Sequence, residues 1–442
     1  MRPFLFILVF ISAALAVSGQ IGTGILASAN GRNFTIADLS DDTRKTTANE
    51  PAIISATRSQ LFAKMLADEL IALEAKARGV TAESLIAAEK VKATGPTEEQ
   101  IKAVYEANRE ALGDKSPAEA RKLVVEYLRR DPEQAAINKY VETLSPKYKA
   151  SAGKSINAAD LKPSDIILTV GSRSFTAKDF DDKYKVVLYD TKSDLIDALK
   201  ADLEEVVYLY LLGVEAKAQN IEPSELIGRE VTNKLKEFSD EERIALENSW
   251  EKKLFSKYGT KFFVKYPEPI VQNIAIDGAP SRGAATAPVT VVMFSDFQCP
   301  ACSATHPVLQ KVLAEYGDKV RFVVRDFPLT TLHPNAYRAA LAAYAANAQG
   351  KFFEYTDVLY KNQSALDGES LSKYAASLGL NVKRFELDLS SENAAAAVKK
   401  DMADGTSYGI TGTPTIFING IATRHLSADG FREAIDLALN KK

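Results

Sequence analysis

The sequence predicts two mostly α-helical repeat modules, each with a short β element, followed by a C-terminal α/β domain. Three observations support this prediction. An internal repeat runs through the first part of the chain, a segment with several Pro and Gly residues follows it, and from Val289 the apolar pattern becomes that of α/β structure. The chain has 442 residues, too many for one ordinary domain, so two or three domains are expected.

The composition is that of an ordinary globular protein. Hydrophobic residues make up 46% of the chain and charged residues 26%. The formal net charge of -3 gives no reason to expect attraction to nucleic acid or to an anionic membrane surface. We therefore expect no nucleic-acid partner.

The first 19 residues have the layout of a secretory signal peptide. Met1-Arg2 gives a positive start, residues 4–17 are apolar, and small residues suited to cleavage follow at Ala16-Val17-Ser18. The apolar stretch is short for a membrane span, which needs about 20 residues, although an uncleaved membrane anchor remains an alternative. We expect an exported protein in the periplasm.

Two segments of the chain resemble each other at one fixed offset. The segment from Arg32 to Asp38 matches the segment from Arg173 to Asp179, and Glu74-Ala75-Lys76-Ala77 recurs as Glu215-Ala216-Lys217-Ala218. Both matches are 141 positions apart, because 175 − 34 and 215 − 74 give the same difference. We infer two copies of one module, at about 25–150 and 166–268, which form helical domains at 20–150 and 151–270.

Each copy has the same local signals. A short apolar strand, at 25–27 or 166–170, is followed by Thr-x-x-Asp. This pattern is typical of a helix start, because the hydroxyl accepts from a backbone N–H and the acid favours the positive helix end. Each Glu-Ala-Lys-Ala segment then precedes a residue suited to ending a helix, Gly79 or Asn220.

These modules resemble the N-terminal chaperone module of SurA, PrsA and related periplasmic folding factors. Residues 96–100 are similar to the helix that enters the prolyl-isomerase domain of that family, and residues 127–148 to the helix that returns from it. Only about Ala111 to Pro117 remains between them, whereas a parvulin-type isomerase needs about a hundred residues. The resemblance implies binding of unfolded exported polypeptides, without isomerase activity.

A linker at 271–288 precedes the C-terminal domain, 289–442. Its first segment, 289–294, is apolar and β-branched, as suits a buried strand. It leads into Cys299-Pro300-Ala301-Cys302, and apolar residues then continue at helical spacing. A Cys-x-x-Cys between a strand and a helix predicts a redox site.

The two cysteines are the only ones in the chain. A disulfide between positions so close closes almost no loop and adds little stability, so the pair is better explained by chemistry. Pro300 suits a first helical turn, which places Cys299 where unpaired N–H groups and the helix dipole stabilise the attacking thiolate. No cofactor beyond the Cys299–Cys302 disulfide is expected. Zinc needs four ligands, and the three histidines are scattered at His306, His333 and His425.

A second signal is Gly412-Thr413-Pro414-Thr415 before an apolar strand, where the proline must lie at the strand entry. With residues 294–302, 325–328, 333–336 and 350–355, this segment resembles the DsbA-like thiol–disulfide oxidoreductases over about 285–442. The resemblance implies an α/β thioredoxin fold with a helical insertion at about 335–401. It also implies that Cys299 is the nucleophile, Cys302 the resolving thiol, and Thr413-Pro414 a cis-proline pair. On sequence alone a plain strand entry stays open.

Three positions qualify the resemblance. Many relatives have a buried acid six residues before the first cysteine, and Met293 stands there. Asp296 either assists proton transfer or is a solvated residue at the strand end. His306 is expected on the helix surface, with a contribution of positive charge as the alternative. The balance between oxidase and reductase is therefore left open.

We expect a thiol–disulfide oxidoreductase that acts on unfolded or partly folded exported proteins, with a membrane or soluble thiol redox partner. Two alternatives remain. The protein is either a chaperone or assembly scaffold in which the redox domain is secondary, or an oligomeric isomerase or reductase. The oligomeric state is left open.

Overall fold

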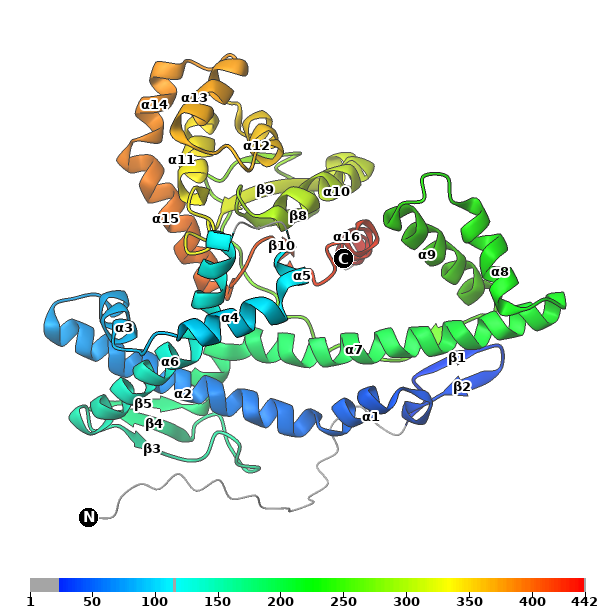
Figure 1. The fold of residues 1–442 in the computed structure, drawn as a ribbon, viewed down its shortest axis with the longest axis horizontal. Coiled ribbons are helices and arrows are strands. Elements are labelled where there is room, and N and C mark those ends of the chain that lie inside the picture. The colour runs from blue at the N-terminus through cyan, green and yellow to red at the C-terminus, as the bar shows by residue number, and fades with distance from the viewer. Residues whose placement is uncertain (1–23, 114–116, 441–442) are drawn as a thin grey trace. The chain divides into compact units, whose positions relative to one another are not determined.

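The computed structural model describes residues 24–113 and 117–440, which divide into two compact units between Pro267 and Glu268. Figure 1 shows the helices and strands of both units. Each unit has its own hydrophobic core. The predicted signal peptide at 1–19 lies outside the described residues. In the described part of the chain, no helix is both long enough and apolar enough to span a bilayer.

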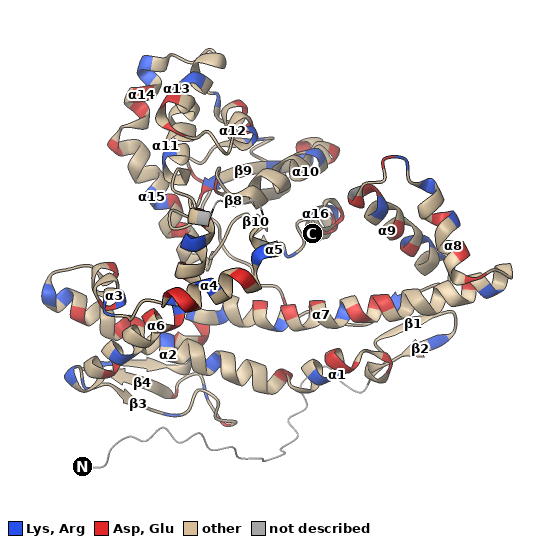
Figure 2. Cartoon of the chain, viewed as in Figure 1, with Lys and Arg blue, Asp and Glu red and all other residues tan. Residues whose placement is uncertain are grey.

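The N-terminal unit is mostly helical and contains two small sheets. Its helices are α1 (Asp41–Ala48), α2 (Glu50–Arg78), α3 (Ala82–Val91), α4 (Glu98–Ala107), α5 (Arg109–Leu112), α6 (Pro117–Lys147), α7 (Ala177–Gln219), α8 (Pro223–Glu230) and α9 (Asp240–Lys257), with 3-10 turns η1 (Ile36–Asp38) and η2 (Thr232–Lys234). Its strands are β1 (Ala27–Ala29), β2 (Arg32–Phe34), β3 (Ser151–Ala152), β4 (Ile166–Val170), β5 (Arg173–Thr176) and β6 (Lys261–Phe262). Figure 1 shows α2 and α7 lying side by side, and in Figure 2 acidic and basic residues are interspersed along α7.

The predicted capping signals are present, but in the first copy Thr35 caps only the 3-10 turn η1, and the first α-helix begins after Ser40. Thr35 and Thr176 each form a capping box with the aspartate three residues later, Asp38 and Asp179. Gly79 and Asn220 end α2 and α7 in the left-handed conformation, as predicted. The copies differ at Pro51, which stands in the first turn of α2, where its missing N–H is tolerated. The corresponding stretch of the second copy lies within the continuous helix α7.

The two predicted copies exchange strands. Strand β1 pairs with its own hairpin partner β2 and also with β6, from the end of the second copy. Strand β4 pairs with β5 and also with β3, which directly follows the predicted end of the first copy. The cores follow this exchange, since Phe34 packs with Leu203 of α7 and Phe175 packs with Leu70 of α2. The predicted boundary at 150/151 therefore lies inside one compact unit.

The C-terminal unit has a five-stranded sheet in the order β11-β10-β8-β9-β7. Its strands are β7 (Ser281–Arg282), β8 (Val289–Ser295), β9 (Val320–Asp326), β10 (Thr415–Ile418) and β11 (Ile421–Ala422). Its helices are α10 (Pro300–Tyr316), η3 (Gly317–Lys319), α11 (Ala336–Asn347), α12 (Phe352–Lys361), α13 (Gly368–Ser377), α14 (Val382–Leu389), α15 (Glu392–Ser407) and α16 (Ala428–Asn440).

Strand connectivity identifies the fold. Strands β8 and β9 are parallel and joined through α10, whereas β10 runs antiparallel to β8. Helices α11 to α15 are inserted between β9 and β10, close to the predicted 335–401 (Figure 1). The C-terminal unit is thus a thioredoxin fold with a helical insertion, and the N-terminal unit is largely helical with short strands, as the sequence predicts.

Candidate active site

The two cysteines lie where strand β8 gives way to helix α10. Cys299 is the N-cap residue of α10, and Pro300 is in its first turn. The Cys299 N–H donates to the carbonyl of Asp296 (3.1 Å), which closes the turn after the strand. The N–H groups at this end of the helix have no partner in the preceding turn, so they are available to a negative charge on the Cys299 sulfur.

The Cys299 thiol faces the loop that precedes β10. Its Sγ donates to the carbonyl oxygen of Thr413 at 3.4 Å. The Thr413–Pro414 bond is cis, and strand β10 pairs with β8 from Thr415 onward, which brings this loop beside the cysteines. The Thr413 hydroxyl is buried and has no hydrogen-bond partner among the described residues, so it is available to donate to a thiolate.

The two thiols, both free, differ in their environments. Hydrogen bonding with Cys302, together with backbone N–H groups of Cys302 and Ala301, holds the pKa of Cys299 well below that of an ordinary cysteine, although desolvation opposes this effect. Cys302 is completely buried, and desolvation raises its pKa. At neutral pH the pair therefore holds one nucleophilic thiolate and one protonated thiol, which is what attack followed by resolution requires.

Asp296 is buried and fully hydrogen-bonded, which corrects the expectation of a solvated residue at the strand end. Its Oδ1 accepts from the Gln298 N–H at 2.7 Å, and its Oδ2 accepts from the Leu329 N–H and contacts His333 Nδ1, both at 2.8 Å. Hydrogen bonds of Asp296 thus connect the turn before Cys299 with the loop that contains His333.

His306 is also buried, not on the helix surface as expected. Its ring lies against that of Tyr360, with centroids 4.7 Å apart, and its Nε2 contacts the Gln310 side chain at 3.0 Å. Desolvation lowers the pKa of His306 to about 4. The residue is therefore neutral at pH 7 and supplies no positive charge to the cysteines, so that alternative is wrong too.

Sequence reasoning missed a pair of buried hydroxyl groups beside Cys302. Ser295 Oγ and Tyr360 Oη lie 2.6 Å apart, and Ser303 donates to the Tyr360 carbonyl. The Ser295 hydroxyl partly offsets the rise in the pKa of Cys302. Ser295 ends an apolar strand and Tyr360 lies in the inserted helix α12, so only the tertiary fold brings them together.

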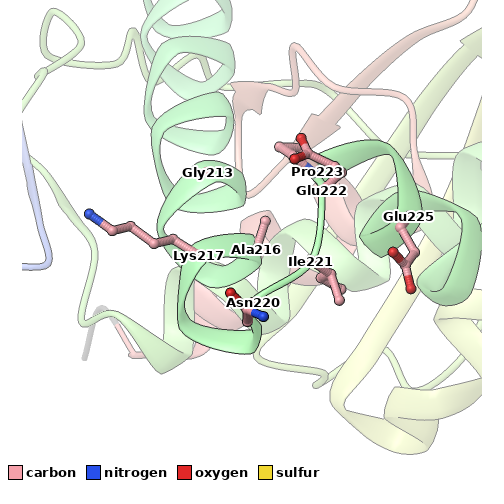
Figure 3. Close-up of a pocket in the computed structure, with 8 residues that line it drawn as sticks. All are labelled: Gly213, Ala216, Lys217, Asn220, Ile221, Glu222, Pro223 and Glu225. Atoms are coloured by element: carbon pink, nitrogen blue, oxygen red, sulfur yellow. The ribbon is translucent and has the colours of Figure 1, made fainter.

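A cavity in the N-terminal unit lies at the C-terminal end of α7 (Figure 3). It has a volume of 480 Å³ and is lined by Gly213, Ala216, Lys217, Asn220, Ile221, Glu222, Pro223 and Glu225. Figure 3 shows Lys217 extending away from Glu225. This lining offers no nucleophile paired with a base, in contrast to the cysteine site. Across the described residues, no three His, Cys, Asp or Glu side chains come together to hold a metal ion.

Comparison with known proteins agrees with this description of the C-terminal unit. A family model described as Thioredoxin matches residues 277–437. Among solved structures, the chain is similar to a thioredoxin-like oxidoreductase from Silicibacter pomeroyi DSS-3, with 26% identity over 38% of this chain and 95% of that one and a TM-score of 0.35. It is also similar to oxidised BdbD from Bacillus subtilis, with 26% identity over 39% and 99% and a TM-score of 0.36.

Curated relatives match only part of the chain. They include the Na(+)/H(+) antiporter NhaA 3 of Salinispora tropica, 41% identical over 139 residues, which is 31% of this chain and 21% of the relative. The Na(+)/H(+) antiporter NhaA 1 of Mycolicibacterium gilvum is 35% identical over 160 residues, 35% of this chain and 26% of the relative. The chain thus spans about a fifth to a quarter of these relatives, and their antiport activity is not transferred to it.

The sheet order, the inserted helices and the family match agree with one another. The C-terminal unit is a thioredoxin-like domain.

Proposed function

We propose that the protein is an exported, periplasmic thiol–disulfide oxidoreductase that forms, reduces or isomerises disulfides in exported polypeptides. One observation carries the proposal. The Cys299 sulfur lies at the N-terminus of α10, next to the Thr413 carbonyl, and the buried Cys302 follows one turn later. Cys299 is the nucleophile, Cys302 the resolving thiol, and Thr413-Pro414 the loop against which an extended substrate lies.

In the oxidising direction, a substrate thiolate attacks the Cys299 sulfur of the Cys299–Cys302 disulfide. Cys302 leaves and takes up a proton, and a mixed disulfide forms. The second substrate thiolate then attacks the substrate sulfur of this bond and releases Cys299 as a thiolate. The substrate loses two electrons and the protein gains them. The low pKa of Cys299 favours this release, because a more acidic thiol is the better leaving group.

In the reducing direction the same steps run backwards. The Cys299 thiolate attacks a substrate disulfide, and Cys302 then displaces the substrate and restores the protein disulfide. A membrane or soluble thiol redox partner resets the site in either case. The equilibrium of Cys299–Cys302 with glutathione decides the direction, since a high reduction potential favours oxidation of substrates and a low one favours their reduction.

Two measurements test the assignment. Cys299 should react with iodoacetamide at pH 7 faster than a free cysteine, and Cys302→Ser should accumulate a mixed disulfide with a reduced, unfolded protein through Cys299. Cys299→Ser is the matched control and should trap nothing. Reactivity of Cys299 equal to that of a free cysteine, with no trapped complex, would reject the oxidoreductase assignment.

We further propose that the N-terminal unit binds unfolded segments and so raises their effective concentration at Cys299. Large apolar side chains exposed on this unit support the idea, among them Val91, Tyr127, Leu209 and Phe238. A cysteine-free, permanently unfolded polypeptide should inhibit turnover of an unfolded protein substrate by the full chain, but not turnover of a short dithiol peptide. Equal turnover of the protein substrate with and without the competitor would contradict this role.

A chaperone or scaffold in which the redox domain is secondary is the second candidate. It is favoured by the size of the N-terminal unit, which makes up more than half of the chain and contains no cysteine. In that case Cys299→Ser should suppress aggregation of an unfolded protein as well as the unchanged chain does. Loss of suppression in this variant would reject the candidate.

A further inference from the structure

We propose that Asp326 accepts the proton that the Cys302 thiol releases when it attacks a mixed disulfide on Cys299, and that it acts through the hydroxyl groups of Ser295 and Tyr360. The inference rests on the oxidoreductase function proposed above. It adds an acid–base partner on the neighbouring strand β9 to the cysteine pair.

The need for such a group follows from the burial of Cys302. A thiol attacks only as a thiolate, and a completely buried thiol has no water at hand to take its proton. Burial also raises the pKa of Cys302, so ionisation without a nearby base is unfavourable. Met293, two residues before Ser295 on strand β8, has no group that accepts a proton.

Strand register places Asp326 beside Ser295, whose hydroxyl neighbours this thiol. Ser295 and Asp326 are the last paired residues of the parallel strands β8 and β9, so their side chains leave the sheet on the same face. That face carries the core formed with α10, which includes Cys302 and Met293. Ser295 Oγ is 2.6 Å from Tyr360 Oη, so a pair of hydroxyl groups lies between the strand ends and the helices.

Asp326 differs from the other acids around it. Its Oδ1 is buried and has no hydrogen-bond partner in the described part of the chain, whereas Asp296 accepts three contacts and Asp401 is paired with Arg325. The residue as a whole is only half-buried, so a proton taken up inside has a way out to solvent. An unpaired acid that reaches from the core to the surface suits proton transfer.

The charged and titratable groups around Asp326 increase the affinity of its carboxylate for a proton. Asp401 from α15 and Asp296 after β8 repel its negative charge, and Arg325 of β9 divides its attraction between Asp401 and Asp404. Together with desolvation, these groups raise the pKa of Asp326 well above its usual range. Tyr360 of α12 responds to charge on both Cys302 and Asp326, which places the three groups in one electrostatic network.

The step balances without a further reagent. The Cys302 sulfur forms a bond with Cys299, the bond between Cys299 and the substrate sulfur breaks, and the substrate leaves as a thiolate that is protonated by solvent. The proton of Cys302 passes to the Asp326 carboxylate and later to solvent. When the protein disulfide is opened by a substrate thiolate, the protonated Asp326 returns a proton to the departing Cys302.

The test separates the resolution step from the first attack. Full-length protein carrying a 5-thio-2-nitrobenzoate mixed disulfide on Cys299 releases the coloured thiol when Cys302 attacks, and the rate is measured from pH 4 to 9. We expect Asp326→Asn to slow release by about 10- to 100-fold, near the lower end of the range for general acid–base catalysis, and to remove one ionisation from the pH–rate profile. The rate of alkylation of Cys299 should be nearly unchanged, because the first attack does not use Asp326.

Stability separates a proton-transfer role from a structural one. A group whose pKa is raised in the folded state destabilises the fold increasingly as pH rises from its unfolded value through its folded value. Asp326→Asn should therefore have a thermal midpoint equal to or above that of the unchanged protein, with a gain that grows above pH 4. Asp401→Asn, which breaks the pair with Arg325 but keeps Asp326, should keep the ionisation in the profile.

The outcomes separate the role of Asp326 from the oxidoreductase function itself. Slow release with normal alkylation and an undiminished midpoint supports the inference. An unchanged release profile in Asp326→Asn, with reactive Cys299, overturns the inference and leaves the oxidoreductase function intact. If Asp326→Asn unfolds, the rate of thiol release is measured instead in the double variant Ser295→Ala, Tyr360→Phe, which lacks both hydroxyl groups. An unchanged release rate in this double variant also overturns the inference. An unreactive Cys299 would defeat the proposed function itself.

Discussion

Two buried glutamates of the N-terminal unit are fully paired, whereas two buried titratable groups around the cysteine site of the C-terminal unit are not, although Asp296 and Arg325 of that unit are paired. In the N-terminal unit, buried Glu74 accepts from Arg78, Lys147 and Tyr148, at 2.5 to 2.7 Å. In the C-terminal unit, Cys302 and the inner oxygen of Asp326 lie in the interior without an opposite charge beside them.

The second copy of the helical module repeats the first arrangement. Buried Glu215 accepts from Lys257 and Tyr258, at 2.6 to 2.8 Å, and also from Gln219. Hydrogen bonds from the lysine and tyrosine are the main cause that lowers the pKa of each glutamate to about 2. Buried acids whose charge is fully paired hold a structure together, whereas an acid and thiols left unpaired can change protonation during a reaction.

The largest expected effect is on the rate of thiol–disulfide exchange, without a change in the stability of the N-terminal unit. Cys299→Ser should reduce thiol–disulfide exchange by roughly 10³-fold or more, as loss of a nucleophile does in other enzymes. Unfolding of the N-terminal unit should not change. Trp250, the single tryptophan, packs against the core of that unit and reports its unfolding by fluorescence. A shift of the Trp250 transition in this variant would show that the units do not separate the two tasks.

The next effect is on stability alone. Glu74→Ala and Glu215→Ala should each lower the free energy of unfolding of the N-terminal unit by about 2–3 kcal/mol, the scale of lost hydrogen bonds to charged groups. Urea unfolding followed by Trp250 measures this loss. Alkylation of Cys299 serves as the control and should be unaffected. Slower alkylation in either variant would contradict the division between the units.

Acid should destabilise the N-terminal unit through the same two glutamates. Each has a folded pKa of about 2 against a reference value of 4.5. A depressed folded pKa contributes stability that is fully present above the unfolded value and is lost as pH falls from about 4.5 toward 2. The Trp250 transition should show this loss, and the double variant Glu74→Gln, Glu215→Gln should have a flatter pH dependence between these values. An equally steep profile in the double variant would place the acid sensitivity elsewhere.

The smallest effect on stability should come from giving the first copy the residue that the second copy has at the corresponding position. Arg78 assists Glu74, whereas Gln219 occupies the corresponding place beside Glu215. Arg78→Gln should lower stability less than either alanine variant, because the arginine side chain is largely solvated and Lys147 remains in place. A loss as large as that of Glu74→Ala would mean that the arginine, not the lysine and tyrosine, neutralises the buried acid.

Local signals in the sequence were sufficient to predict much of this structure. The caps at Thr35 and Thr176 depend on neighbours within three residues, and the position of Cys299 depends on the apolar strand before it and on Pro300 after it. The cis bond at Thr413–Pro414 forms where the resemblance to DsbA-like oxidoreductases implies it, whereas the local sequence alone left a plain strand entry open.

Burial was the property that the sequence did not reveal. His306 and Asp296 were misplaced because the groups that cover them, Tyr360 and the loop at Leu329 to His333, come from elsewhere in the chain. Strand exchange was missed for the same reason. Strands β3 and β6 have only two residues each, too few for an apolar period, and their partners lie far along the sequence.

Strand exchange also affects the order in which the chain is able to fold. Ala27 and Ser28 lie beside Phe262 and Lys261 in the finished sheet, so one edge of the first hairpin stays open until residues 261 and 262 have been synthesised. An open strand edge invites pairing with other chains. The nascent N-terminal unit is thus exposed to the same mispairing that a folding factor would counter in its clients.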